Sequence, residues 1–287
     1  MSDRSFKTYL SSVKYYRLFL IAQTSMLITI KMQIAHKNII LTGAASGIGK
    51  ALLGQLLDFE GVKIIAVDLN RIENASDTII PFVCDLSQQS EVDRLFAFGI
   101  AQFQKIDIFI ANAGFAYYEV MDQPDWQRIE KIFQVNVFSP MYAFQKMKDL
   151  NVGREYFVLM TSSAMAKVAI PGYALYGATK AALDRFEDAY RFESQDLGHL
   201  SLVYPIATKT NFFNRSTDSS RKDVVVPFPA QTPEEVAEAM IKGIMANKTH
   251  IHPSTLFQIG RFFQRIFEII VLPYQYFYAR KLKEWSK

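Results

Sequence analysis

Apolar and polar positions alternate in a regular way between Lys37 and His252, where short apolar runs are separated by longer amphipathic stretches. The short runs are typical of buried strands, and they cover residues 38–42, 62–68, 79–84, 106–111, 156–161 and 200–204. The amphipathic stretches predict helices at 47–59, 91–103, 126–150 (one long helix or two abutting ones) and 174–196. A further helix is predicted after Thr232, because Pro233 and two glutamates follow this N-capping residue.

Strands that alternate with helices predict an α/β fold with a parallel sheet covered on both faces. Right-handed crossovers then make the sheet doubly wound, and ligands of such sheets bind beyond the carboxyl ends of the strands. We therefore expect one catalytic and nucleotide-binding domain at 37–253. An apolar and basic leader at 1–36 precedes it, and a C-terminal amphipathic helix with a basic-aromatic tail follows at 254–287.

The C-terminal segment 256–272 has an apolar stripe at helical spacing, and Pro273 ends the predicted helix. The stripe consists of Leu256, Ile259, Phe263, Ile266, Phe267 and Ile270. Arg261, Arg265 and Glu268 face the other way, so a full membrane span is not expected. The pattern favours a helix at a membrane interface, and the alternatives are a helix over the substrate pocket or against a partner subunit.

The leader contains an apolar run at 18–30 that is short for a membrane span and contains Gln23, Thr24 and Ser25. No small-residue cleavage site follows it, so we do not expect a signal peptide. Met32 lies just before the catalytic domain. The leader is therefore interpreted as dispensable or as a start-site artefact.

Charge is distributed unevenly along this chain of 287 residues with a net charge of +4. Residues 1–37 carry six basic and one acidic side chain, and residues 254–287 carry six basic and two acidic ones. The body, 38–253, carries 20 basic and 25 acidic side chains. An acidic body argues against nucleic-acid binding, whereas basic and apolar ends favour peripheral contact with an anionic membrane.

The chain is 50% hydrophobic, as expected for one large domain with a substantial core. Its single cysteine, Cys84, excludes an intramolecular disulfide and a thiolate-rich metal site. The four histidines are scattered, so no metal is expected. These features favour a cytoplasmic protein.

A glycine-rich turn follows the first strand, with the sequence Thr42-Gly43-Ala44-Ala45-Ser46-Gly47-Ile48-Gly49. Glycines permit a tight turn and let the backbone approach a pyrophosphate, and the next helix directs its N-terminal amides at the phosphates. The predicted cofactor-binding residues of this turn are Gly43, Ser46, Gly47, Ile48 and Gly49.

Polar residues also follow the next three strands. Asp68 lies 19 residues after Gly49, where its carboxylate can bind the adenosine ribose and repel a 2′-phosphate. Leu69 follows it and no basic residue lies in the turn, so NAD is favoured over NADP. Asp85 is expected near the adenine, and the run Asn112-Ala113-Gly114 is expected beside the cofactor.

Tyr176 and Lys180 lie one turn apart on a predicted helix. A lysine ammonium in that position stabilises a tyrosinate, which is what a general acid/base for an alcohol requires. Ser163 lies thirteen residues before Tyr176, just after the fifth strand, where its hydroxyl can hold a substrate oxygen.

Together these motifs resemble the short-chain dehydrogenase/reductase family over residues 37–252. The resemblance rests on TGAASGIG at 42–49, Asp68, Asp85, NAG at 112–114, Asn136, Ser163 and YGATK at 176–180. It implies a Rossmann fold and hydride transfer between a nicotinamide dinucleotide and an alcohol or ketone. It also implies that Asn136 holds a water, that Lys180 binds the nicotinamide ribose and that Tyr176 transfers the proton.

One position departs from the family pattern. The family usually has Pro-Gly after the sixth strand and then a threonine near the nicotinamide amide. Pro205 and Thr210 match that pattern, but Ile206 replaces the glycine. A β-branched residue adopts a positive φ with difficulty, so we expect this loop to take another path or to be strained.

Apolar and aromatic residues are expected to line the substrate site. They are Phe115, Tyr117, Tyr118, Met165, Tyr173, Phe212 and Phe213. This lining predicts a small apolar alcohol or ketone as the substrate, and we also expect a homo-oligomer. The alternative function is a non-catalytic dinucleotide sensor or scaffold with the same fold.

Overall fold

A computed structural model describes residues 32–73, 75–121, 123–193, 196–210, 212, 229–262 and 277. The chain divides into two units, 1–32 and 33–287, and the elements below all belong to the second. The predicted leader and most of the C-terminal tail lie outside the described residues. Within the described residues, no helix has the length and apolar character needed to cross a membrane.

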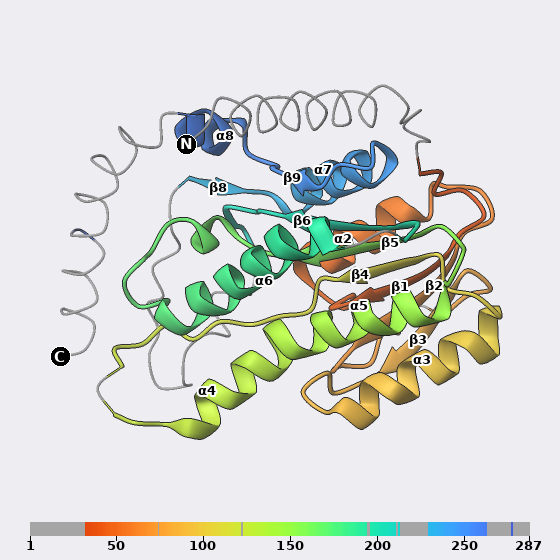
Figure 1. The fold of residues 1–287 in the computed structure, drawn as a ribbon, viewed down its shortest axis with the longest axis horizontal. Coiled ribbons are helices and arrows are strands. Elements are labelled where there is room, and N and C mark those ends of the chain that lie inside the picture. Colours follow the sequence, from red (N-terminus) through yellow and green to blue (C-terminus); the bar gives the residue numbers. More distant parts are fainter. Residues whose placement is uncertain are drawn as a thin grey trace, which may run out of the picture. The chain divides into compact units, whose positions relative to one another are not determined.

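A seven-stranded parallel sheet forms the centre of the second unit, in the order β3-β2-β1-β4-β5-β6-β9 (Figure 1). Its strands are β1 (Asn38–Thr42), β2 (Lys63–Asp68), β3 (Ile79–Val83), β4 (Ile108–Ala111), β5 (Tyr156–Thr161), β6 (Gly198–Val203) and β9 (His250–Ile251). The strand order reverses between β1 and β4, which makes the sheet doubly wound as predicted. The fold class is therefore confirmed.

Helices cover both faces of this sheet. They are α2 (Gly47–Leu56), α3 (Gln89–Phe103), α4 (Trp126–Phe133), α5 (Ser139–Leu150), α6 (Ala174–Glu193), α7 (Pro233–Met245) and α8 (Thr255–Phe262). Helices α3, α5 and α6 bury Val92, Phe144 and Leu183 in one large core cluster with the sheet. Helices α2 and α7 pack against each other (Figure 1). The helix α7 begins with a capping box between Thr232 and Glu235, as the sequence pattern indicates.

The predicted helix at 126–150 is interrupted. A π-helical turn, η1 (Gln134–Phe138), separates α4 from α5, and the Ser139 amide donates to the Gln134 carbonyl five residues earlier. Such turns are frequent at functional sites because they shift side chains out of the regular helical register. Asn136 is one of the two buried residues of this turn.

Short elements that the hydrophobic pattern does not predict complete the fold. The 3-10 turn η2 (Ala164–Ala166) follows β5, and β7 (Ala207–Thr208) pairs with β8 (Ala230–Gln231) in a separate two-stranded sheet. Strand β9 extends the main sheet beyond β6. Each of these elements has only two or three residues, which is too short to show a periodicity.

Candidate active site

A cavity of about 780 Å³ lies beyond the carboxyl ends of the parallel strands. At one end it is lined by Asp68 and Asp85, which follow β2 and β3, and at the other by aromatic and aliphatic residues. Ser163 and Tyr176 also line it. Ligands of doubly wound sheets bind at this edge. One continuous cavity thus joins a polar half, near the glycine-rich turn, to an apolar half.

The glycine-rich turn has the backbone geometry that an anion site requires. Gly43 and Gly47 have φ angles of +70° and +54°, which side chains with a Cβ rarely adopt. Ser46 is the N-cap residue of α2 but forms no side-chain capping hydrogen bond. The first amides of α2 therefore remain available for a phosphate, and these residues fit the pyrophosphate of a dinucleotide.

The third glycine of the turn has a different position. A Cβ on Gly49 would lie 1.9 Å from the carbonyl oxygen of Gly43, so any larger residue would push the turn away from α2. Gly49 does not line the cavity, whereas Gly43, Ser46, Gly47 and Ile48 do. The close approach of helix and turn explains why glycine is needed here, and a cofactor contact of Gly49 stays a prediction.

The carboxylate of Asp68 points back to the turn. Its Oδ2 accepts a hydrogen bond from the Ala45 amide at 3.0 Å, and its Oδ1 accepts from the Asn70 amide at 2.9 Å. Asp68 therefore links the end of β2 to the glycine-rich turn, and it also lines the cavity. Asp85 lines the same part, and its Oδ1 accepts from the Ser87 amide at 3.0 Å.

Asn112 links the ends of three strands. Its side-chain amide donates to the carbonyls of Thr42 and Gly43, at 3.3 and 3.4 Å, and its Oδ1 accepts from the Thr161 hydroxyl at 3.4 Å. A Cβ on Gly43 would lie 2.9 Å from the Cα of Ala113. The turns after β1 and β4 therefore pack backbone to backbone, and Ala113 and Gly114 form part of the cavity wall.

Tyr176, Ser163 and Lys180 all line the cavity. A side-chain hydrogen bond joins Tyr176 to Ser163, and the Lys180 Nζ lies 5.5 Å from the centre of the Tyr176 ring. Lys180 Nζ donates to the carbonyl of Thr161 at 2.7 Å. The Ser163 Oγ accepts from the Met165 amide at 3.1 Å, which fixes its rotamer. The residues predicted from two separate motifs are thus adjacent.

Burial shifts the pKa of both titratable groups toward the neutral form. It raises the pKa of Tyr176 to about 12, and the hydrogen bond with Ser163 offsets part of that rise. Burial also lowers the pKa of Lys180 to about 7. The expected lowering of the tyrosine pKa therefore requires Lys180 to carry its proton, because only the ammonium stabilises a tyrosinate.

Asn136 is bonded to the protein through both ends of its amide. Its Oδ1 accepts from the Phe115 amide at 3.1 Å, and its Nδ2 donates to the Phe115 carbonyl at 2.9 Å and to the Thr179 hydroxyl at 3.2 Å. It connects the π turn, the loop after β4 and α6. Asn136 does not line the cavity, and its implied role in holding a water stays a prediction.

The loop after β6 does not show the backbone strain that was expected at Ile206. The described non-glycine residues with a positive φ are His36, Gln104 and Asn247, so Ile206 keeps an ordinary backbone. The Pro205 carbonyl accepts from the Ala164 amide at 2.9 Å, and the loop continues into β7. Thr210 reaches the phosphate turn, since a Cβ on Gly47 would lie 3.1 Å from its Cγ2. The loop therefore contains no left-handed residue at Ile206.

The apolar half of the cavity contains only some of the predicted aromatic residues. Phe115, Tyr117, Met165 and Phe212 line it. Tyr118 and Tyr173 do not: each is 1% exposed, and their rings pack together in a core cluster beneath it, so this prediction was wrong. Phe213 lies outside the described residues. The Tyr176 ring packs edge-on against Phe212 at 5.5 Å between centroids.

The family model of the short chain dehydrogenases matches residues 37–221. The chain belongs to this family. Its members are oxidoreductases that act on CH–OH groups with NAD or NADP, so this short-chain dehydrogenase is an enzyme of that class. The match covers the phosphate turn, Asn136, Ser163, Tyr176 and Lys180.

Curated relatives and solved structures resemble most of the described domain. The chain is 27% identical to a 3-ketodihydrosphingosine reductase of Dictyostelium discoideum, over 75% of this chain and 74% of the relative. It is 26% identical to the human dehydrogenase/reductase SDR family member 11, over 74% and 89%. These similarities support the family assignment.

Among solved structures, a short-chain dehydrogenase/reductase from Burkholderia phymatum in complex with NAD superimposes with a TM-score of 0.69, at 17% identity over 79% of this chain and 92% of that one. A 3-ketoacyl-(acyl-carrier-protein) reductase from Brucella melitensis with NADH gives 0.68, at 22% identity over 77% and 97%. A third, from Sphingobium yanoikuyae, gives 0.64 with NADPH, at 19% identity over 76% and 88%. At these identities the structures support the fold.

The sequence motifs of this short-chain dehydrogenase did not indicate several residues that line the cavity. Val168 and Ile170, after η2, and Leu256 and Phe257, in α8, complete the apolar wall of the cavity. The helix α8 therefore borders the pocket, which was one of the alternatives for the C-terminal segment. Only the amphipathic pattern at 256–272 pointed to α8, and nothing in the sequence pointed to the residues after η2.

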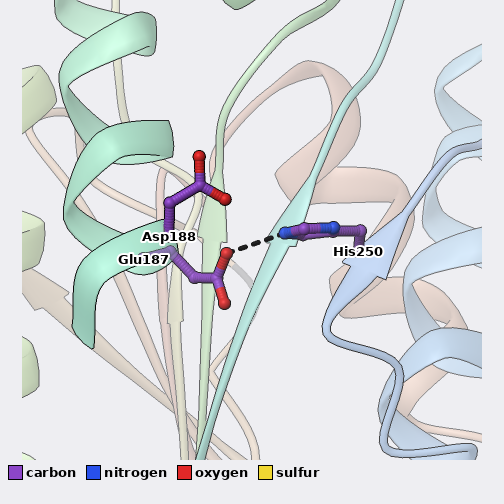
Figure 2. Close-up of side chains that lie close together, drawn as sticks. All are labelled: Glu187, Asp188 and His250. Atoms are coloured by element: carbon purple, nitrogen blue, oxygen red, sulfur yellow. Dashed lines mark hydrogen bonds and ion pairs between the residues drawn. The ribbon is translucent and has the colours of Figure 1, made fainter. Parts of the chain in front are cut away.

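Glu187, Asp188 and His250 form a cluster that sequence spacing also missed (Figure 2). His250 Nε2 lies 2.7 Å from Oε2 of Glu187, which is 1% exposed, so this contact ties α6 to β9. The ligand atoms are close enough for a metal ion. However, the Arg191 guanidinium contacts both carboxylates and supplies the positive charge there. We therefore interpret this cluster as a structural contact.

Proposed function

We propose that this short-chain dehydrogenase transfers hydride between NAD(H) and a secondary alcohol or ketone with an apolar body. The observation that carries the proposal is that Tyr176, Ser163 and Lys180 line the same cavity as the glycine-rich turn and the apolar residues. A reacting carbon held there lies against a proton-transfer group on one side and the dinucleotide site on the other. This is the arrangement that alcohol–ketone interconversion needs.

The protein's part in reduction is the supply of a proton and of hydrogen bonds. As the carbonyl oxygen gains negative charge, the Tyr176 phenol transfers its proton to that oxygen, and the Ser163 hydroxyl donates a hydrogen bond to it. Lys180, as the ammonium, stabilises the phenolate that remains. The dinucleotide supplies the hydride in this direction and accepts it in the reverse one. In oxidation the Tyr176 phenolate accepts the hydroxyl proton.

NAD is the cofactor that the residues after β2 favour. The Asp68 carboxylate lines the cavity where an adenosine ribose would be held, and Leu69 after it carries no charge for a 2′-phosphate. Solved structures of similar fold hold NAD, NADH, NADP or NADPH. The choice of NAD therefore rests on the chain's own Asp68 and Leu69.

An apolar substrate follows from the composition of the second half of the cavity. Its residues are Phe115, Tyr117, Met165, Val168, Ile170, Phe212, Leu256 and Phe257. Burial of alkyl or ring carbons against such a wall contributes about 25 cal/mol per Å². Two similar proteins have names that describe the reduction of keto compounds, 3-ketodihydrosphingosine reductase and 3-ketoacyl-(acyl-carrier-protein) reductase. These names agree with an aliphatic ketone.

A panel of aliphatic and aromatic ketones, assayed with NADH and with NADPH, tests this function. We expect consumption of NADH with at least one apolar ketone, followed as loss of absorbance of the reduced nicotinamide. Tight dinucleotide binding without turnover of any ketone or alcohol would instead favour the sensor or scaffold function. No dinucleotide binding would contradict both functions.

Peripheral membrane contact is a second, separate part of the proposal. Leu256 and Ile259 of α8 are 64% and 60% exposed, although Phe257 between them is buried. They belong to the predicted apolar stripe, whose remaining members lie outside the described residues. An anionic lipid surface suits this stripe because the flanking tail is basic. Flotation with phosphatidylserine vesicles tests it, with Leu256→Ser/Ile259→Ser as the variant expected to lose binding. Homo-oligomerisation stays a prediction.

A further inference from the structure

A buried ion pair lies behind the catalytic residues and outside the cavity lining. The Asp184 carboxylate, on α6, is 2% exposed, and its Oδ2 lies 2.6 Å from Nζ of Lys167, at the end of η2. The Lys167 side chain is 27% exposed, so this ammonium reaches solvent while its partner does not. The pair joins the segment that carries Ser163 to the helix that carries Tyr176.

Ser162 extends this pair to the backbone of the catalytic lysine. Its hydroxyl donates to Oδ1 of Asp184 at 3.1 Å and lies 3.4 Å from the carbonyl oxygen of Lys180. Ser162 is 1% exposed and immediately precedes Ser163. Lys180 and Asp184 are one helical turn apart, so their side chains share one face of α6. Both oxygens of a buried carboxylate thus contact the segment 162–167, which follows β5 and includes η2.

We propose that Asp184, through Lys167 and Ser162, is a positioning residue that sets the charge and the location of Lys180. The inference rests on the proposed function, because it assigns Asp184 a task in the same proton transfer. A carboxylate without a cation beside it is costly to bury, and the Lys167 ammonium supplies that cation. The ion pair is then neutral as a whole, so neither an uncompensated anion nor an uncompensated cation lies on that side of Lys180.

Few titratable groups lie on the described elements that surround Lys180. On α6 the titratable neighbours are Tyr176 and Asp184, and Lys167 follows η2. The ends of β5 and β4 and the π turn provide Thr161, Gly114 and Asn136, which do not titrate. Asp68 and Asp85 line the far, cofactor end of the cavity. Breaking the pair therefore leaves one uncompensated charge beside the turn of α6 that Lys180 and Asp184 share.

The two halves of the pair make opposite predictions. Asp184→Asn removes the anion and leaves the Lys167 ammonium, so the pKa of Lys180 should fall by about half a pH unit or more. Lys167→Met leaves the Asp184 carboxylate, so the pKa of Lys180 should rise by a similar amount. The double variant has neither charge and should return close to the wild-type value. If Asp184 and Lys167 served only in packing, the two single variants would not shift the pKa of Lys180 in opposite directions.

Lysine ¹³Cε NMR on the full-length protein measures these titrations directly. Lys180→Arg assigns the Lys180 signal, and burial places its titration, with a pKa of about 7, in an accessible pH range. Asp107→Asn is the matched control, because Asp107 is also a buried carboxylate paired with a lysine, but before the amino end of β4. This control should leave the Lys180 midpoint unchanged.

Shifts of opposite sign in the two single variants support the proposal. Unchanged midpoints, or shifts in one direction for both variants, overturn it. If Asp184→Asn does not fold, Lys167→Met alone still decides, because its side chain is partly exposed and a rise of the Lys180 midpoint is required. The titration needs no substrate, so a chain that shows the opposite shifts but turns over no ketone would refute the proposed function and not this inference.

Discussion

A buried charged group lies near each end of strand β4, and the two groups have different partners. Just before its amino end, Asp107 is 6% exposed, contacts Nζ of Lys105 at 2.9 Å and accepts a hydrogen bond from the Asn38 amide at 2.9 Å. Beyond its carboxyl end, Lys180 is 3% exposed, and its Nζ donates to the Thr161 carbonyl. Within the described residues, no carboxylate forms an ion pair with Lys180.

Because of this difference, we expect Asp107 to stabilise the fold and Lys180 to take part in proton transfer. The carboxylate at the amino end is fully bonded, so it holds β1 and β4 together. The amine at the carboxyl end is desolvated without a counter-charge, which lowers its pKa to about 7. Such a group is costly to the folded state and useful for proton transfer. We therefore expect substitutions at the two ends to affect different properties.

Among substitutions at the two ends of β4, the largest expected effect comes from Lys180→Met. Ketone turnover should fall by about 10²- to 10³-fold, because no ammonium remains to stabilise the tyrosinate. Steady-state assays with the best substrate of the ketone panel measure this loss. A loss smaller than tenfold would contradict the role assigned to Lys180.

The same variant should be more stable than the wild type at neutral pH. The folded-state pKa of Lys180, about 7, lies below the ordinary value of 10.5. The unfolded chain therefore binds the extra proton, and the folded state is destabilised most at pH 7 and below. This penalty disappears as the pH rises from about 7 toward 10.5, so the stability gap between variant and wild type should narrow over that range. Urea unfolding at several pH values measures the gap.

Asp107→Ala should have the reverse profile. It leaves the Asn38 amide without its acceptor, which should lower the free energy of unfolding by about 2 kcal/mol. Turnover per folded molecule should stay within twofold of the wild type, because Asp107 lies just before the amino end of β4 and the cavity lies beyond the carboxyl ends of the strands. Urea unfolding and kcat together check both halves of this statement. A selective loss of kcat would break the comparison between the two ends.

Asp68→Asn should have the smallest effect of the three. The amide keeps an oxygen for the Ala45 amide, but it loses the charge that favours ribose hydroxyls and repels a 2′-phosphate. NAD affinity should fall about tenfold, with less effect on NADP. Titration of the protein with each dinucleotide, followed by fluorescence, measures the ratio. Equal losses for both cofactors would assign Asp68 to the stability of the turn alone.

The sequence predicted the elements and site residues that depend on local patterns. Every strand of the main sheet except β9 has an apolar run, and residues that follow such strands must meet at one edge of a parallel sheet. Gly43, Asp68 and Ser163 were placed in this way, and all three line the cavity. The order of the motifs along the chain was sufficient for this part of the site.

Features that depend on tertiary contacts were not predictable. The run around Asn136 has ordinary helical spacing, so nothing indicated a π turn. Tyr118 was expected in the substrate site because, like Tyr117, it lies in the loop after Gly114, but the two rings lie in different environments, one buried in the core and one on the cavity wall. The pairing of Asp184 with Lys167 joins residues from two elements whose relative placement only the fold determines.

The most direct test of the account is Tyr176→Phe, which removes one hydroxyl and leaves the ring that packs against Phe212. Turnover of the best ketone and the dissociation constant of NADH should be measured on the same preparation. We predict a loss of turnover of about 10³-fold or more, with NADH affinity within a few-fold of the wild type. Turnover close to the wild-type rate with intact NADH binding would contradict the assignment of Tyr176 as the proton-transfer residue.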